Sequence, residues 1–117
     1  NIKNQKKSNQ SITRYEVLSV KNNISLIVFW PLTGKKHQLR IVAKYIGCPI
    51  IGDSKYNTLK NISSSELKLN SYSIKFIFEN REYKFFSQLP QSFTNFLQKK
   101  NIKINTINKI NKLLNLS

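Results

Sequence analysis

The chain has 117 residues, enough for one compact domain, and 39% of them are hydrophobic, enough for a packed core. Twenty Lys and Arg stand against five Asp and Glu, which gives a formal charge of +15. This shortage of acids excludes a two-carboxylate hydrolase and a carboxylate-bound metal site. A single Cys and a single His exclude a disulfide scaffold and a structural zinc site, so we predict no metal site.

The excess of positive charge favours a polyanionic partner, most often nucleic acid. More than half of the charge lies in residues 1–21 and 99–117, where Asn, Ile and Lys are abundant, a composition typical of AT-rich coding sequences. No apolar run is long enough to span a bilayer, so we expect no membrane partner. The first residue is Asn rather than Met, so we expect a segment or a processed product of something longer.

Two strands and a helix are predicted first along the chain. Residues 13–20 alternate and are rich in β-forming residues, residues 25–32 form a nearly continuous apolar run, and Lys21-Asn-Asn between them suits a hairpin turn. Residues 36–46 are predicted to form a helix that Gly47 ends.

The second half of the chain predicts another hairpin and another helix. Residues 67–78 and 83–87 are the expected hairpin arms, joined by a turn at Asn80-Arg81, and residues 58–65 before them read as a loop. A last helix is predicted over residues 92–99, after Pro90. The pattern predicts an α+β fold with a mixed or mainly antiparallel sheet and flanking helices.

Three regions are expected from these patterns. Residues 1–10 are a flexible basic lead-in, residues 11–98 are the folded portion, and residues 99–117 are a basic tail. The tail has apolar residues at steps of three and four, which fits either a weak amphipathic helix or a poorly ordered segment; they are Ile107, Ile110, Leu113 and Leu114.

The helix predicted over residues 36–46 has a basic face. Lys36, Arg40 and Lys44 recur every four residues, and a basic stripe after a glycine turn suits contact with phosphates. An ordinary amphipathic helix with solvated lysines has the same spacing, and the spacing alone leaves both interpretations open.

Two consecutive motifs make this region specific. T-G-K-K-H-Q-L-R runs from Thr33 to Arg40, and G-C-P-I-I-G-D-S-K-Y runs from Gly47 to Tyr56. In order and spacing they resemble the signature of the RluA-type pseudouridine synthases, T-G-R-T-H-Q-I-R followed after about six residues by G-x-P-I-x-G-D-x-x-Y. The resemblance extends over residues 11–98 and implies the C-terminal portion of that family's catalytic domain.

The resemblance implies roles for individual residues. Arg40 takes the place of the arginine that pairs with the catalytic aspartate, and Leu39 that of its neighbour in the uridine pocket. Lys35 replaces the family's Arg and Lys36 its usual Thr; with Lys44 they are expected to contact RNA. The remaining motif residues are expected to shape the loops, and they are Thr33, Gly34, His37, Gln38, Gly52, Asp53 and Tyr56.

One part of the family pattern does not occur in these 117 residues. The family's nucleophilic aspartate lies upstream in an H-R-L-D-x-x-T-S-G segment and its stacking tyrosine in a K-x-Y motif, and neither is present. Asp53 lies in the G-D-x-x-Y element and is not expected to be the nucleophile.

We therefore expect the C-terminal fragment of an isomerase that converts uridine to pseudouridine in structured RNA, rRNA in particular, without a cofactor. Its partners would be RNA and the upstream remainder of the domain, in a bacterial cytoplasm or an organelle matrix, and the fragment alone would be inactive. The alternative is a non-catalytic RNA-binding component, for example on a ribosome, that retains the synthase fold.

Overall fold

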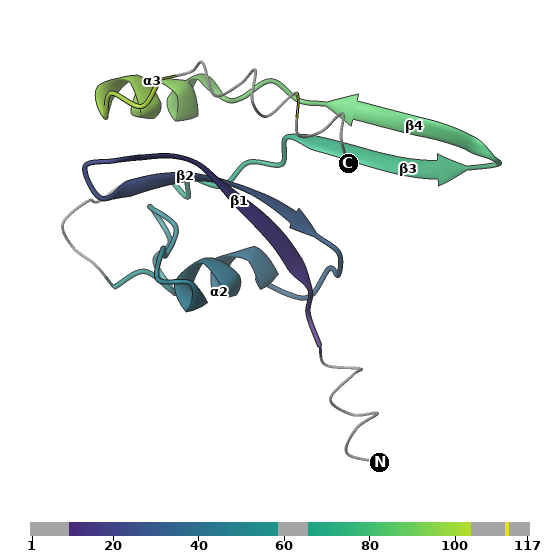
Figure 1. Ribbon diagram of the computed structural model, residues 1–117, viewed down its shortest axis with the longest axis horizontal. Helices are drawn as coiled ribbons and strands as arrows, with labels where there is room; N and C mark the ends of the chain where they lie inside the picture. Colours follow the sequence, from purple (N-terminus) through teal and green to yellow (C-terminus); the bar gives the residue numbers. More distant parts are fainter. Residues whose placement is uncertain (1–9, 59–65, 104–111, 113–117) are drawn as a thin grey trace, which may run out of the picture.

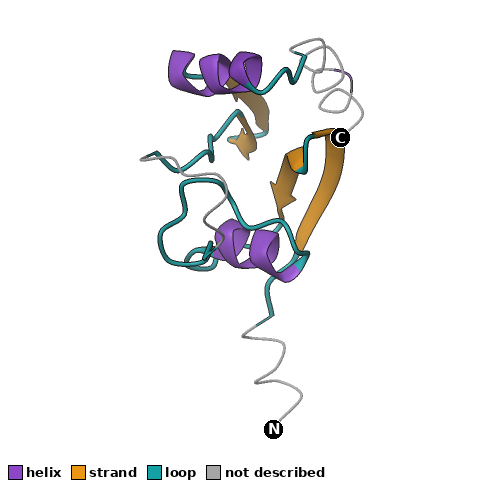
Figure 2. Ribbon diagram, turned by 90° about the vertical axis from the view of Figure 1, so that its left-hand side faces the viewer, coloured by secondary structure: helices purple, strands orange, loops and turns teal. Residues whose placement is uncertain are grey.

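The computed structural model describes residues 10–58, 66–103 and 112 (Figures 1 and 2). In these residues the chain forms two antiparallel hairpins and two helices, which confirms the α+β class. The elements in order are β1 (Thr13–Lys21), β2 (Ile24–Pro31), α2 (Gln38–Tyr45), β3 (Ser73–Phe78), β4 (Arg81–Phe86) and α3 (Gln91–Lys99). The predicted lead-in, except for residue 10, and most of the basic tail lie outside the described residues.

Both hairpins turn on two residues with left-handed backbones. Asn22 and Asn23 have φ of 53° and 63° between β1 and β2, and Glu79 and Asn80 have φ of 51° and 63° between β3 and β4. Positive φ at both central residues gives the twist that suits a hairpin. The first turn is where the sequence placed it, and the second lies one residue earlier than Asn80-Arg81.

The prediction of a strand over residues 67–78 is wrong in its first half, because β3 begins only at Ser73. The backbone before it bonds to loops instead of to a facing strand. The Lys68 N–H donates to the Ile51 carbonyl, and the Ser87 N–H donates to the Tyr72 carbonyl, which closes the open end of the hairpin. Figure 1 shows β3 and β4 projecting beyond the rest of the structure.

Helix α2 is shorter than predicted at its N-terminal end. His37 precedes it with a left-handed φ of 54°, so regular helix begins at Gln38 and Lys36 lies outside it. The predicted basic stripe is therefore wrong in its first member, because Lys36 does not share a helical face with Arg40 and Lys44. At the other end Gly47 has φ of 85° and donates its N–H to the Lys44 carbonyl, as a helix-ending glycine does.

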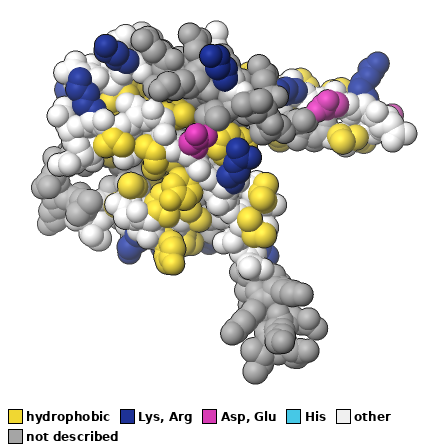
Figure 3. Space-filling model, viewed as in Figure 1, with side chains coloured by type: hydrophobic (Ala, Val, Ile, Leu, Met, Phe, Trp, Pro, Cys, Tyr) yellow, Lys and Arg dark blue, Asp and Glu magenta, His cyan; other side chains and the backbone are white. Residues whose placement is uncertain are grey.

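The core of the described residues is small. Helix α3 follows Pro90 and buries Leu97, which packs with Ile24 of β2 and with Ile102. Many larger apolar side chains stay at the surface, as the face in Figure 3 illustrates. Exposed examples are Tyr15, Val17 and Val20 on β1, Ile41 and Tyr45 on α2, and Ile74, Ile77, Phe78, Phe85 and Phe86 on the β3–β4 hairpin.

Candidate functional site

A buried glutamine holds the loop between β2 and α2. The Oε1 of Gln38 accepts hydrogen bonds from the Thr33 hydroxyl at 2.7 Å and from the Lys35 N–H at 3.0 Å. Its Nε2 donates to the Ile12 carbonyl at 2.9 Å and to Thr13 Oγ1 at 2.7 Å. All four hydrogen-bonding positions of the amide are used, so the side chain can be buried without penalty. Thr33 and Gln38 thereby fix the loop against the start of β1.

This loop borders a hollow of about 340 Å³ that is open to solvent. Its volume falls within the range of ~300–1,000 Å³ found for small-molecule sites. Leu39 and Arg40, the two residues for which the resemblance predicts catalytic roles, both line it. The other lining residues are Pro31, Gly34, Lys35, His37, Gln38 and Leu69. Pro31 and Leu69 lie outside the two consecutive motifs, and the fold brings them here.

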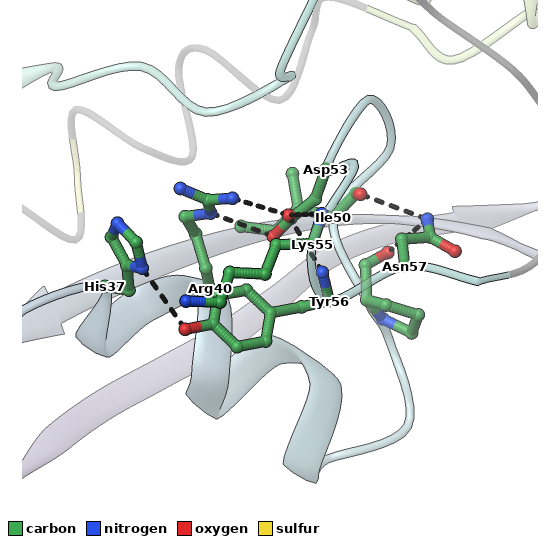
Figure 4. Close-up of polar contacts among 8 residues, drawn as sticks. His37, Arg40, Ile50, Asp53, Lys55, Tyr56 and Asn57 are labelled. Atoms are coloured by element: carbon green, nitrogen blue, oxygen red, sulfur yellow. Dashed lines mark hydrogen bonds and ion pairs between the residues drawn. The ribbon is translucent and has the colours of Figure 1, made fainter.

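The strongest electrostatic contact at the site joins Arg40 to Asp53 (Figure 4). Arg40 Nε donates to Oδ2 at 3.0 Å and Nη2 donates to Oδ1 at 2.7 Å, a bidentate pair. The Asp53 side chain is fully buried, whereas that of Arg40 is 21% exposed. Hydrogen bonds from Arg40 lower the pKa of Asp53 to about 2 despite its burial, so the carboxylate stays ionised.

Asp53 also caps the turn that follows it. Its Oδ1 accepts hydrogen bonds from the Lys55 N–H at 3.0 Å and the Tyr56 N–H at 3.1 Å. Gly52, just before it, has φ of 85°, and a β-carbon there would collide with the Glu66 backbone carbonyl. Asn57 closes the turn by donating its side-chain amide to the Ile50 carbonyl at 3.0 Å. The G-D-x-x-Y element thus brings one carboxylate under the guanidinium of α2.

Tyr56 joins the pair to His37. The Arg40 guanidinium carbon lies 5.2 Å from the centre of the Tyr56 ring, and His37 Nδ1 lies 3.2 Å from the Tyr56 hydroxyl. Burial, together with the positive charges of Arg40, Lys55 and Lys36, lowers the pKa of His37 below its ordinary 6.5. The imidazole is therefore neutral at pH 7, and its Nδ1 shares one hydrogen bond with the Tyr56 hydroxyl.

The lysines are spread around this site. Lys35 lines the hollow, Lys36 is exposed just before α2, and Lys44 is exposed in the last turn of α2. Lys55, which the sequence did not single out, lies with its Nζ 5.4 Å from the centre of the Tyr56 ring. Its position as a basic residue between the Asp and the Tyr of the second motif could have identified Lys55 from the sequence.

The described part of the chain holds no group of three or more His, Cys, Asp or Glu that is arranged to bind a metal ion. None of the helices described in it is long and apolar enough to cross a membrane.

Comparison with known proteins identifies the class to which this arrangement belongs. The chain is 42% identical over 88 residues to the ribosomal large subunit pseudouridine synthase C of Rickettsia conorii, which covers 72% of this chain and 29% of the relative. It is 34% identical over 90 residues to the ribosomal large subunit pseudouridine synthase D of Borreliella burgdorferi, covering 75% of this chain and 28% of that protein. An RNA pseudouridine synthase of Zymomonas mobilis is 33% identical over 90 residues, 41% of its length.

These relatives are all named as pseudouridine synthases, and the chain spans less than half the length of each. Over the matched segment the chain belongs to the RluA-type pseudouridine synthase family, which confirms the resemblance found in its two motifs. No protein-family model matches the chain. No solved structure matches it.

Proposed function

We propose that residues 11–98 are the C-terminal portion of the catalytic domain of an RNA pseudouridine synthase. The reaction detaches the base of a uridine from its ribose at nitrogen and reattaches it through carbon, in structured RNA and specifically in rRNA. Arg40 is proposed to pair with the nucleophilic aspartate and Leu39 to pack against the uridine. The observation that carries this proposal is their position side by side on the hollow, with Arg40 already held by a buried carboxylate.

The nucleophile is proposed to come from the upstream part of the same domain, so that this chain alone is inactive. Asp53 is a poor nucleophile because its side chain is fully buried and both of its oxygens accept hydrogen bonds. Two further features favour a docked upstream part. Large apolar side chains are exposed on both hairpins, and two buried donors, Trp30 Nε1 and Asn70 Nδ2, have no acceptor among the described residues.

RNA contact is proposed for Lys35, which lines the hollow, and for Lys36 and Lys44, which are exposed before α2 and in its last turn. Changing all three to Gln should weaken binding of an rRNA fragment and flatten the salt dependence of the affinity. The slope of log affinity against log salt should shrink by up to about 0.7 for each phosphate that is no longer neutralised. If the slope does not change, these lysines do not contact RNA phosphates. The free cysteine, Cys48, suits the reducing interior of a bacterial cytoplasm or an organelle matrix.

The decisive experiment uses the complete protein that carries this chain, acting on RNA tritiated at C5 of uridine. Reattachment through C5 displaces the tritium, so its release reports turnover. Arg40→Ala should reduce kcat by about 100-fold or more, because the reacting centre is deprived of a charge partner, and should leave RNA affinity nearly unchanged. Arg14→Ala is the matched control, since Arg14 on β1 lies over the Trp30 ring of β2 and does not line the hollow.

Two outcomes would contradict the proposal. If the complete protein has no aspartate in an H-R-L-D segment, the alternative of a non-catalytic RNA-binding component that keeps the fold replaces the enzyme. If Arg40→Ala loses RNA affinity and turnover in parallel, Arg40 is a phosphate contact and not a partner of the nucleophile.

A further inference from the structure

Asp53 holds only one edge of the Arg40 guanidinium. That edge consists of Nε and Nη2, whose N–H groups point to Oδ2 and Oδ1. A guanidinium has five N–H donors, so the outer edge formed by Nη1 and the second Nη2 hydrogen remains. No acceptor for Nη1 occurs in residues 10–58 or 66–103, and Figure 4 shows one terminal nitrogen of Arg40 pointing away from Asp53.

The outer edge of Arg40 is accessible, whereas its partner is not. The Arg40 side chain is 21% exposed and lines the hollow, while the Asp53 side chain is fully buried and is fixed by two backbone N–H groups. Any further anion must therefore approach the guanidinium from the side of the hollow. Asp53 cannot follow it, because releasing Asp53 would leave the N–H groups of Lys55 and Tyr56 without their acceptor.

The plane of the guanidinium is also restrained. The Tyr56 ring lies beneath it at 5.2 Å, and the ring is itself held by the contact of its hydroxyl with His37. His37 meets the ring edge-on, with ring centres 5.8 Å apart at 80°. One edge and one face of the guanidinium are thus fixed by groups that the G-D-S-K-Y turn brings to α2. A long side chain that would otherwise sample many rotamers is held in one.

We propose that Asp53, with Tyr56, is a positioning residue that aims the outer edge of Arg40 into the hollow, where it receives a second carboxylate, the nucleophilic aspartate. This inference rests on the proposed function and adds to it a guanidinium shared by two carboxylates. The buried one sets the geometry before the other part of the site is in place. Preorganisation of this kind matters because a displacement of about 1 Å at a reacting centre can cost about 100-fold in rate.

The test compares variants of the complete protein by tritium release and by NMR of the Arg40 guanidinium. In Asp53→Asn, which keeps the size of the side chain and an acceptor for the turn, kcat should fall by about 10- to 100-fold while KM and RNA affinity change less than about twofold. The Arg40 Nε–H resonance should exchange slowly in the wild type and rapidly in the variant. Glu66→Gln is the matched control, because it removes an acid from the exposed pair with Lys68.

Asn57→Ala distinguishes the effect of the turn around Asp53 from the effect of the contact between Asp53 and Arg40. It removes hydrogen bonds that brace the same turn and leaves Asp53 on Arg40. The proposal expects a much smaller loss of kcat in Asn57→Ala than in Asp53→Asn, and equal losses would overturn it. Turnover of Asp53→Asn at the wild-type rate would overturn it as well.

If Asp53→Asn does not fold, Tyr56→Leu decides, since it removes the ring under the guanidinium while the Asp53 carboxylate stays. A reduced kcat with an unchanged KM then supports the proposal, and an unchanged kcat refutes it. If the wild-type protein itself releases no tritium, the proposed function fails, whereas the exchange of the Arg40 Nε–H still reports whether Asp53 holds Arg40.

Discussion

Gln38 and Thr13 are joined side chain to side chain by a hydrogen bond of 2.7 Å that ties the first residue of α2 to the first residue of β1. The same amide donates to the Ile12 carbonyl. The contact with the Ile12 carbonyl needs an N–H donor at that position, which a carboxylate lacks. The glutamine of the first motif is therefore a structural residue of the loop that borders the hollow.

Gln38→Glu should make the protein sensitive to pH. A carboxylate facing the Ile12 carbonyl is disfavoured, so the pKa of the introduced carboxyl group would rise above its unfolded value of about 4.3. The sign follows from linkage: stability is retained below that value and declines as the pH rises from the unfolded pKa towards the folded one. At pH 7 the free energy of unfolding should fall by about 2 kcal/mol.

Urea unfolding at pH 4 and pH 7 measures this difference, with Gln38→Leu as the control. Leucine forms none of these hydrogen bonds but does not titrate, so its destabilisation should be similar at both pH values. A Glu variant as stable at pH 7 as at pH 4 would mean that Gln38 does not donate to Ile12.

The Arg40–Asp53 pair should contribute stability that disappears in acid. The pKa of Asp53 is lowered from 3.8 to about 2 by its hydrogen bonds from Arg40. A group with a lowered folded pKa stabilises the protein above its unfolded pKa and loses that contribution as the pH falls through the folded one. The free energy of unfolding should therefore fall between about pH 4 and pH 2, and Asp53→Asn should lack this part of the slope. Glu66→Gln, in which the buried pair is intact, should keep it.

His37 should report on the charge around the site. Its pKa lies below 6.5 because of burial first and then because of Arg40, Lys55 and Lys36, with Asp53 acting in the opposite direction. Lys36→Gln should therefore raise the pKa of His37, as followed by its ring proton resonances from pH 4 to pH 8. Lys44→Gln serves as the control, since Lys44 is not among the charges that act on His37. Equal shifts in both variants would indicate a general charge effect and not a local one.

Substitution of the two glycines with left-handed backbones separates the cost of backbone strain from the cost of a steric collision of the added β-carbon. Gly47 and Gly52 share a φ of 85°, but a β-carbon at Gly47 meets nothing within 4 Å, whereas at Gly52 it meets the Glu66 carbonyl and the Leu67 Cα. Gly47→Ala should cost about 1–2 kcal/mol from the left-handed backbone alone. Gly52→Ala should cost distinctly more, because residues 66 and 67 must also move. Thermal unfolding of the two variants compares them directly, and equal losses would contradict the close approach at Gly52.

The local features of this chain could be predicted from its sequence better than its long-range contacts could. The Lys21-Asn-Asn turn, the two helices and the glycine after α2 all follow from short-range preferences, and the structure has them. The prediction of a strand over residues 67–72 was wrong because alternation of apolar and polar residues does not specify which backbone segment will pair with them. In the structure the Lys68 N–H donates to the Ile51 carbonyl of a loop. Lys36 was wrongly predicted to lie in the helix for a related reason. His37 has a left-handed backbone and makes no side-chain capping hydrogen bond, so the sequence has no capping signal for a helix that begins at Gln38.

The same distinction applies to the candidate site. The motifs identified Arg40 and Asp53, 13 residues apart, as separate elements with separate expected roles. Their pairing depends on how the turn at Gly52 folds back on α2, which no local pattern encodes. The lining residues Pro31 and Leu69 are likewise adjacent only in the fold.

The left-handed turns have a consequence at the level of the gene. Of the six residues other than glycine with positive φ in the described ranges, four are asparagines: Asn22, Asn23, Asn80 and Asn101. Glycine adopts this conformation most readily and asparagine is the common substitute, but glycine codons begin with GG and asparagine codons with AA. A coding sequence under pressure towards A and T can thus exchange one for the other at turns without losing the hairpins. Asn22, Asn23 and Asn80 hold three of the four central positions of the two hairpin turns, at a small cost in backbone strain that glycine would avoid.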